Sequence, residues 1–163
     1  MKISKGQTVL VDATFAALIF ALLFFALNNM FIMGFETEQT KGELSEMSLL
    51  ANSRLDLLVK SSGIPKNWED IGIDDVNQIG LANHERQLAE QKVNTFKNLA
   101  SDYNATKALI GLQKYDYYFV LESIPQNTAG LPPQSDATQV VAQRIVTFQG
   151  AETLASLTIY KIE

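Results

Sequence analysis

Side chains suited to acid–base or metal chemistry are few in this sequence of 163 residues. His84 is the only histidine, and there are no cysteines. A Ser-His-Asp triad needs a positioned imidazole, and a zinc site needs several His or Cys ligands. Neither the G-x-x-x-x-G-K-[ST] phosphate loop nor the G-x-G-x-x-G fingerprint occurs. We therefore expect no enzymatic activity, no catalytic residue, no cofactor and no bound metal.

A group of carboxylates between residues 69 and 75 is the one candidate for cation binding. Glu69, Asp70, Asp74 and Asp75 could supply oxygen ligands to Ca²⁺. The group lacks the D-x-D-x-D-G spacing of a regular calcium loop. A solvated acidic loop is the favoured interpretation, and a calcium site is the alternative.

The charge balance argues against nucleic acid as a partner. The chain carries 13 Lys and Arg against 18 Asp and Glu, which gives a net charge of −5. A nucleic-acid-binding domain normally presents a basic face. The acidic balance therefore favours other partners.

Residues 9–27, VLVDATFAALIFALLFFAL, form an apolar run that only Asp12 and Thr14 interrupt. A helix needs about 20 predominantly apolar residues to cross a bilayer. The run has 19, and Met30 to Phe35 extend it beyond two asparagines. It therefore predicts one transmembrane helix.

Charges on the two sides of the run predict its orientation. Lys2 and Lys5 precede it, whereas Glu36 and Glu38 follow it. Flanks rich in Lys and Arg remain on the cytoplasmic side. We expect a single-pass protein of the cell membrane with a cytoplasmic N-terminus and with everything after Phe35 outside.

An N-glycosylation acceptor sequence, Asn104-Ala105-Thr106, lies in the part expected outside. The motif is short and arises often by chance. It marks Asn104 as a candidate for glycosylation and leaves its occupancy open.

The N-terminus differs from an ordinary secretory signal peptide, whose apolar core spans about 7 to 15 residues and ends at an A-x-A-like site. Here the run is longer, and Phe24 would occupy the −3 position before Ala26. Another processing site precedes the run, where a short basic leader meets a small residue at Lys5-Gly6-Gln7. Cleavage between Gly6 and Gln7 would leave the apolar helix on the mature protein.

The segment MKISKG, followed by QTVLVDATFAALIFALLFF, resembles the class III signal peptide of archaeal type IV pilin-like proteins, which a prepilin peptidase cuts between a Gly and a Gln. The resemblance covers residues 1 to about 30. It implies a mature chain that begins at Gln7 and assembles with other pilin-like subunits into a surface filament. A long N-terminal helix followed by a small β-rich head is also similar to the family.

The sequence departs from this family at its acidic residue. The family usually carries a glutamate as the fifth residue of the mature chain, whereas here the fifth is Val11 and the sixth is Asp12. Removal of Lys2 and Lys5 with the leader would change the net charge from −5 to −7.

Asp12 has two interpretations, because a carboxylate at the centre of a bilayer costs about 2.5 to 3.5 kcal/mol and less toward either end. It could meet a cation of a neighbouring subunit, such as a new α-amine on Gln7, and so set the axial register of packed helices. Alternatively, it lies at headgroup level or becomes protonated. Both interpretations stay open at this point.

A single long helix is expected over residues 7–61. Residues 36–60 contain no proline, and apolar side chains recur there at spacings of three and four. Gly63 and Pro65 suit a helix end, since Gly adopts the left-handed cap conformation and Pro cannot continue a helix. The expected apolar stripe consists of Leu44, Met47, Ala51, Leu55 and Leu58.

The remaining chain predicts a small head in which Trp68 covers the edge of the core. Helical periodicity and cap residues predict two short helices, at 88–99 and 101–110. Alternation and β-branched residues predict strands, at 78–82, 115–122, 140–148 and 154–162. The intervening stretches are expected to be a polar turn at 83–86, a polar loop at 125–136 and a hairpin turn at 149–152.

The expected fold class is α+β. A long N-terminal helix, with a membrane-spanning half and an amphipathic half, packs on a small antiparallel β-sheet head with two short helices. The expected parts are a leader at 1–6, a transmembrane or filament-core helix at 7–35, the amphipathic half of the same helix at 36–62 and an extracytoplasmic head at 63–163.

Two functions follow from this arrangement. The first is a structural subunit, major or minor, of an archaeal type IV pilus-like surface filament, whose partners are other pilin-like subunits, a prepilin peptidase and the membrane. The alternative is a single-span membrane-anchored extracellular binding module, which has no need of cleavage at Gly6. Nucleic acid is expected as a partner in neither.

Overall fold

The computed structural model describes the backbone of residues 5–161 and, within that range, the side chains outside 5–12, 32–41 and 100–101. The protein is α+β, and it divides into two compact units, Met1–Glu43 and Leu44–Glu163. We describe each unit by itself. Residues 1–4 of the predicted leader, 1–6, lie outside the described residues.

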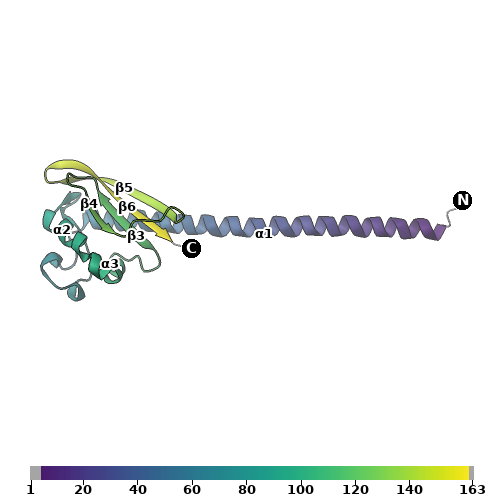
Figure 1. The fold of residues 1–163 in the computed structure, drawn as a ribbon, viewed down its shortest axis with the longest axis horizontal. Coiled ribbons are helices and arrows are strands. Elements are labelled where there is room, and N and C mark those ends of the chain that lie inside the picture. Colours follow the sequence, from purple (N-terminus) through teal and green to yellow (C-terminus); the bar gives the residue numbers. More distant parts are fainter. Residues whose placement is uncertain (1–4, 162–163) are drawn as a thin grey trace. The chain divides into compact units, whose positions relative to one another are not determined.

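The first unit is helical throughout its described backbone. Helix α1 spans Lys5–Lys60 and so continues into the second unit (Figure 1). Residues 13–31 contain neither Gly nor Pro and are rich in Ala, Leu and Phe. These residues favour a helix, since Ala and Leu have the highest helix propensities.

Residues 44–60 of α1 form the centre of the second unit. Met47, Ala51, Leu55 and Leu58 are fully buried, which confirms this part of the expected stripe. Leu44, in contrast, retains 37% of its exposure, so the buried stripe begins one turn later than expected. The helix ends at Lys60, and Gly63 follows with φ +86°, as the stop signal predicts.

The second unit contains six strands, two α-helices and three short 3₁₀ helices besides α1, among the residues that the structure describes. The 3₁₀ helices are η1 (Trp68–Asp70), η2 (Ile73–Asp75) and η3 (Leu99–Asp102), and the α-helices are α2 (Glu90–Asn98) and α3 (Tyr103–Leu109). The strands are β1 (Ala82–His84), β2 (Gln87–Leu88), β3 (Asp116–Leu121), β4 (Asn127–Gly130), β5 (Thr138–Phe148) and β6 (Ala151–Lys161).

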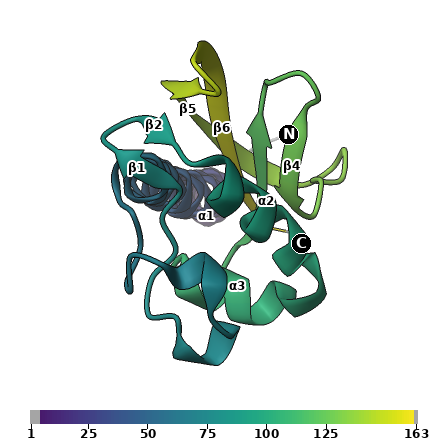
Figure 2. The same ribbon diagram turned by 90° about the vertical axis from the view of Figure 1, so that its left-hand side faces the viewer.

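These strands form one sheet in the order β1-β2-β5-β6-β3-β4. All neighbours are antiparallel except β2 and β5, which are parallel through the pair Gln87↔Thr147. The sheet is therefore mixed rather than purely antiparallel. Figure 2 shows it curling around α1, with α2 and α3 on the side away from β5.

One strand, one turn and one loop prediction were wrong in detail. The strand expected at 78–82 lies at Ala82–His84, and only Gln78 makes an isolated bridge, to Ile64. The polar turn shortens to residues 85–86, because the strand already includes Asn83 and His84. The loop expected at 125–136 contains the edge strand β4, whose alternate residues Asn127 and Ala129 are buried. A short polar strand of this kind is defined by its hydrogen bonds to a neighbouring strand, so its amino-acid composition does not predict it.

The core joins α1 to the inner face of the sheet and to α2. Alternate residues of β3, namely Tyr117, Phe119 and Leu121, are buried, as the alternation predicts. Phe96 of α2 packs edge-on against Phe119, with ring centroids 5.7 Å apart. Trp68 is 1% exposed and donates from Nε1 to the Gly80 carbonyl over 2.7 Å, so it lies inside this core and not at its edge.

Candidate assembly segment and head surface

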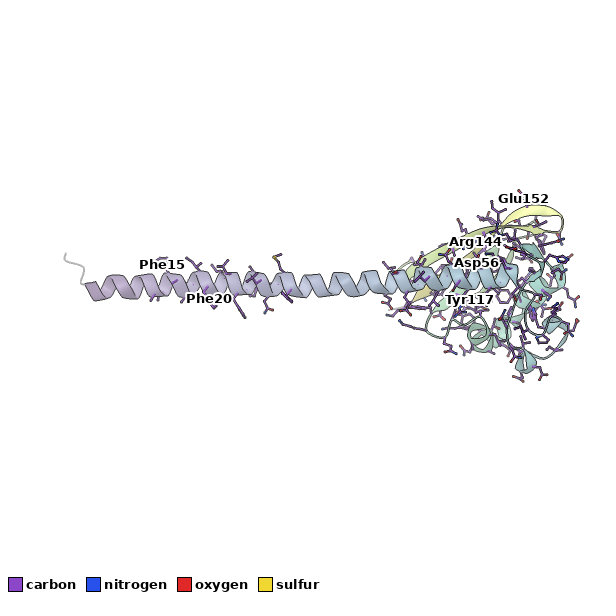
Figure 3. All side chains as sticks on the ribbon, turned by 180° about the vertical axis from the view of Figure 1, so that it is seen from behind. Phe15, Phe20, Asp56, Tyr117, Arg144 and Glu152 are labelled. Carbon is purple, nitrogen blue, oxygen red and sulfur yellow. The ribbon has the colours of Figure 1, made fainter. Side chains whose placement is uncertain are left out.

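The apolar segment Ala13–Phe31 of α1 is long and apolar enough to cross a membrane. None of its side chains is buried within the chain. Phe15 and Phe20 project from the helix in Figure 3, and their exposed fractions are 62% and 71%. So much exposed apolar surface marks a membrane or protein contact.

Asn29, a polar residue within the segment, forms a hydrogen bond with the backbone of its own helix. The Asn29 side chain donates from Nδ2 to the Phe25 carbonyl, one turn earlier, over 3.1 Å. In lipid an unpaired polar group is costly, and a bond to the helix's own backbone lowers that cost. Asn29 is therefore compatible with burial of this segment in an apolar medium.

The predicted processing and register residues lie at the start of α1. Gly6, Gln7 and Asp12 are helical in their backbone, but their side chains lie outside the described residues. The Gly6–Gln7 bond falls in the first turn, where a helix opens most easily.

The expected acidic cluster does not converge on one point. The Glu69 carboxylate lies 3.5 Å from the buried Lys92 Nζ, and Asp70 accepts a hydrogen bond from Gln91. Asp74 and Asp75 are exposed in η2. No group of three acidic or histidine side chains that could hold a metal occurs among the described residues.

The remaining sequence candidates are surface residues. His84 is exposed at the end of β1. Asn104 is exposed on α3, whereas Thr106 of the same acceptor sequence is fully buried and donates its hydroxyl to the Asp102 carbonyl over 3.0 Å. The acceptor asparagine is thus accessible on the folded head, but the hydroxyl of its motif is not.

Arg144 of β5 contacts Asp56 and Asn52 of α1, and we call this group the clamp between α1 and β5. It was not predicted from the sequence. Arg144 donates from Nε to Asp56 over 2.8 Å and from a terminal nitrogen to Asn52 over 3.1 Å, and Figure 3 shows Asp56 and Arg144 together. Lys60 forms a second ion pair with Asp56 at 3.1 Å. The Arg144 hydrogen bond, the largest cause, lowers the pKa of Asp56 below its usual 3.8. The partners are 88 residues apart, so spacing could not reveal them.

A second polar cluster ties α3 to β3. Asp116 accepts hydrogen bonds from the Tyr103 hydroxyl over 3.0 Å and from Lys107 over 2.8 Å. The Tyr103 ring stacks on Tyr117 with centroids 5.2 Å apart. Burial is the main cause that raises the pKa of Tyr103 above its usual 10, and its hydroxyl is a protonated donor at neutral pH.

The surface of the head has a groove of about 310 Å³ where β3 ends and the β5–β6 hairpin turns. Its floor includes Phe148, and Ile124 on its rim is 99% exposed. Glu122 and Glu152 also line it, and the structure gives neither an ion pair among the described residues. The groove could hold a ligand with a cationic group and an apolar body.

No protein-family model, curated protein or solved structure matches the chain.

Proposed function

We propose that this chain is a structural subunit of an archaeal type IV pilus-like surface filament, released from its leader by cleavage between Gly6 and Gln7. In this proposal the segment 13–31 spans the membrane before assembly, with the N-terminus in the cytoplasm. It then packs against the same segment of other subunits. The role is structural, and no enzymatic step is assigned to the chain.

The observation that supports the proposal best is the continuity of α1. The helix carries an apolar segment with no buried side chain and then supplies Met47 and Leu55 to the core of the head. Identical helices that meet through unlike surfaces form heterologous contacts, and these build a filament when the rotation between neighbours does not close into a ring. Apolar burial would drive the contact once the helix leaves lipid.

The mass of the N-terminus tests this proposal. The protein is recovered from the membrane fraction and from the sheared surface fraction of its native host. A chain that begins at Gln7 and occurs in the sheared fraction is the expected result. A chain that retains Met1 or Lys2 and stays in the membrane would overturn the proposal.

A binding module anchored by one span is the second candidate, and the groove between Glu122 and Glu152 favours it. The variant Gly6→Leu separates the two functions, because a branched side chain replaces the small residue before the cleaved bond. It should abolish filament incorporation of a subunit. It should leave the location of an anchored module unchanged.

A further inference from the structure

Among the described residues of the head, β5 has the longest open strand edge. β5 has 11 residues and pairs with β6 along its whole length. On its other side it pairs only with the two-residue strand β2, at Thr147. The stretch from Thr138 to Val146 therefore has a strand on one side only (Figure 1).

The direction of the free backbone groups follows from one hydrogen bond. The Thr147 N–H donates to the Arg86 carbonyl over 2.7 Å, so it points away from β6. In an antiparallel ladder this direction alternates along the strand. The four preceding residues that share it are Gln139, Val141, Gln143 and Ile145.

These four residues are also accessible. All are exposed, and the exposed fractions of Val141 and Ile145 are 51% and 64%. Among the hydrogen bonds of the described residues, none uses the backbone N–H of these four. The Gln143 carbonyl accepts from Arg144, and the other three carbonyls have no such partner. A long edge of this kind is a template for another strand.

We propose that β5 pairs edge to edge, antiparallel, with β5 of a second copy of this chain. The occupant is a strand because only an extended backbone matches a row of donors and acceptors spaced two residues apart. The partner strand is β5 of the second copy, because two copies of one strand can pair antiparallel about a two-fold axis. This arrangement satisfies the free backbone groups of both copies at once.

The charges on β5 are compatible with this self-pairing. Arg144 is its one charged residue, and its guanidinium is held by Asp56 and Asn52. With the axis at Val141, Arg144 lies opposite Thr138, and with the axis at Gln143 it lies opposite Ala142. Neither arrangement places like charges opposite each other, which would be destabilising. The contact extends the sheet across two heads and does not depend on the apolar segment of α1.

Cysteine cross-linking of the full chain in detergent micelles tests the contact, because the protein has no cysteine of its own. The variants Gln139→Cys, Val141→Cys, Gln143→Cys and Ile145→Cys are oxidised with copper phenanthroline, singly and in pairwise mixtures. Gln134→Cys, in the exposed loop before β5, is the control. Paired strands bring opposite Cα atoms to about 5.5 Å, within disulfide reach.

We expect the pairs of one register to cross-link at least about tenfold faster than the control, since pairing holds the thiols at an effective concentration near millimolar. For an axis at Val141 these are Val141→Cys alone and the Gln139→Cys and Gln143→Cys mixture. For an axis at Gln143 they are Gln143→Cys alone and the Val141→Cys and Ile145→Cys mixture. Moving the cysteine by two residues should remove this advantage. Equal rates at all positions would show random collision or association through α1 alone, and either result would overturn the inference.

A second variant tests the contact without changing the reporter cysteine. With the axis at Val141, Val141→Lys places two ammonium groups at the axis and should slow the cross-link of the Gln139→Cys and Gln143→Cys mixture about tenfold. With the axis at Gln143, Gln143→Lys has the same effect on the Val141→Cys and Ile145→Cys mixture.

Gln134→Lys is the matched control for both lysine variants. Trp68 fluorescence checks that each variant stays folded. An unchanged rate in the folded lysine variant at the axis would overturn the inference. If the protein forms filaments but no cysteine pair of β5 cross-links faster than the control, the inference is overturned and the proposed function still stands.

Discussion

Gly63 shows how one residue allows a tight connection after α1. Its φ is +86°, and an added Cβ would lie 2.3 Å from Cδ1 of Trp68. A residue with a Cβ costs about 1 to 2 kcal/mol in the left-handed region even without a clash. The turn therefore needs glycine for both its backbone angle and its space.

We predict that Gly63→Ala lowers the free energy of unfolding by more than about 2 kcal/mol. Urea unfolding followed by the fluorescence of Trp68, the only tryptophan, measures the loss. Gly72→Ala is the matched control, because no atom lies within 4 Å of its added Cβ. Equal stability of the two variants would contradict this account of the turn.

The ionisation of Asp56 makes the stability of the head depend on pH. The pKa of Asp56 lies below 3.8 in the folded protein, mainly because Arg144 donates to its charged form. The stabilisation is therefore present above pH 3.8 and is lost as the pH falls through the lower folded pKa. Asp56 is 34% exposed, so solvent reduces the effect.

For Asp56→Asn we expect a loss of about 0.5 to 1 kcal/mol at pH 7. Thermal unfolding at pH 7 and pH 3 should then differ less in the variant than in the parent protein. A variant with the full pH dependence of the parent would show that other carboxyl groups are responsible.

At the scale of elements, α1 changes its surroundings along its length. Between residues 44 and 60 it presents one stripe to the core, in which Leu55 is fully buried, while Leu49 on another face is 72% exposed. Such a stripe lets one side of a helix pack on a sheet while the other stays in solvent. The helix and the sheet therefore stabilise each other.

Leu55→Ala should cost about 2 to 5 kcal/mol, because it leaves a cavity in the core. Leu49→Ala should change the free energy of unfolding by less than about 0.5 kcal/mol. Both are measured by denaturant unfolding of the full chain in micelles. A similar loss in both variants would mean that the stripe is not the packed face.

At the scale of the whole molecule, Asp12 carries the clearest test of filament register. We predict that Asp12→Ala leaves the protein folded and membrane-bound but reduces filament yield, because a smooth apolar helix has no charge to define its axial position. Electron microscopy of the sheared fraction and membrane fractionation give the two readouts.

Thr14→Ala, two residues along the same segment, controls for loss of polarity alone. It should assemble normally. Filaments of normal yield and appearance from Asp12→Ala would favour the other interpretation of Asp12, in which the carboxyl group lies at headgroup level or is protonated.

The sequence by itself determined the elements whose signals are local. The apolar segment, the end of α1 near Gly63 and the alternation of β3 were all readable, because helix and strand periodicity and cap residues act between near neighbours. The exposed positions of His84, Asp74 and Asp75 also followed from their polar surroundings. Glu69, in contrast, pairs with the buried Lys92, and its side chain is only 12% exposed.

Only the tertiary structure decided the features that join distant residues. The parallel pair β2–β5, the strand β4 and the clamp between Asp56 and Arg144 depend on partners that the chain brings together only on folding. The same holds for the open edge of β5, since an edge exists only once strand order is known. Sequence patterns encode which face of a strand is buried, but strand order is set by packing across the whole core.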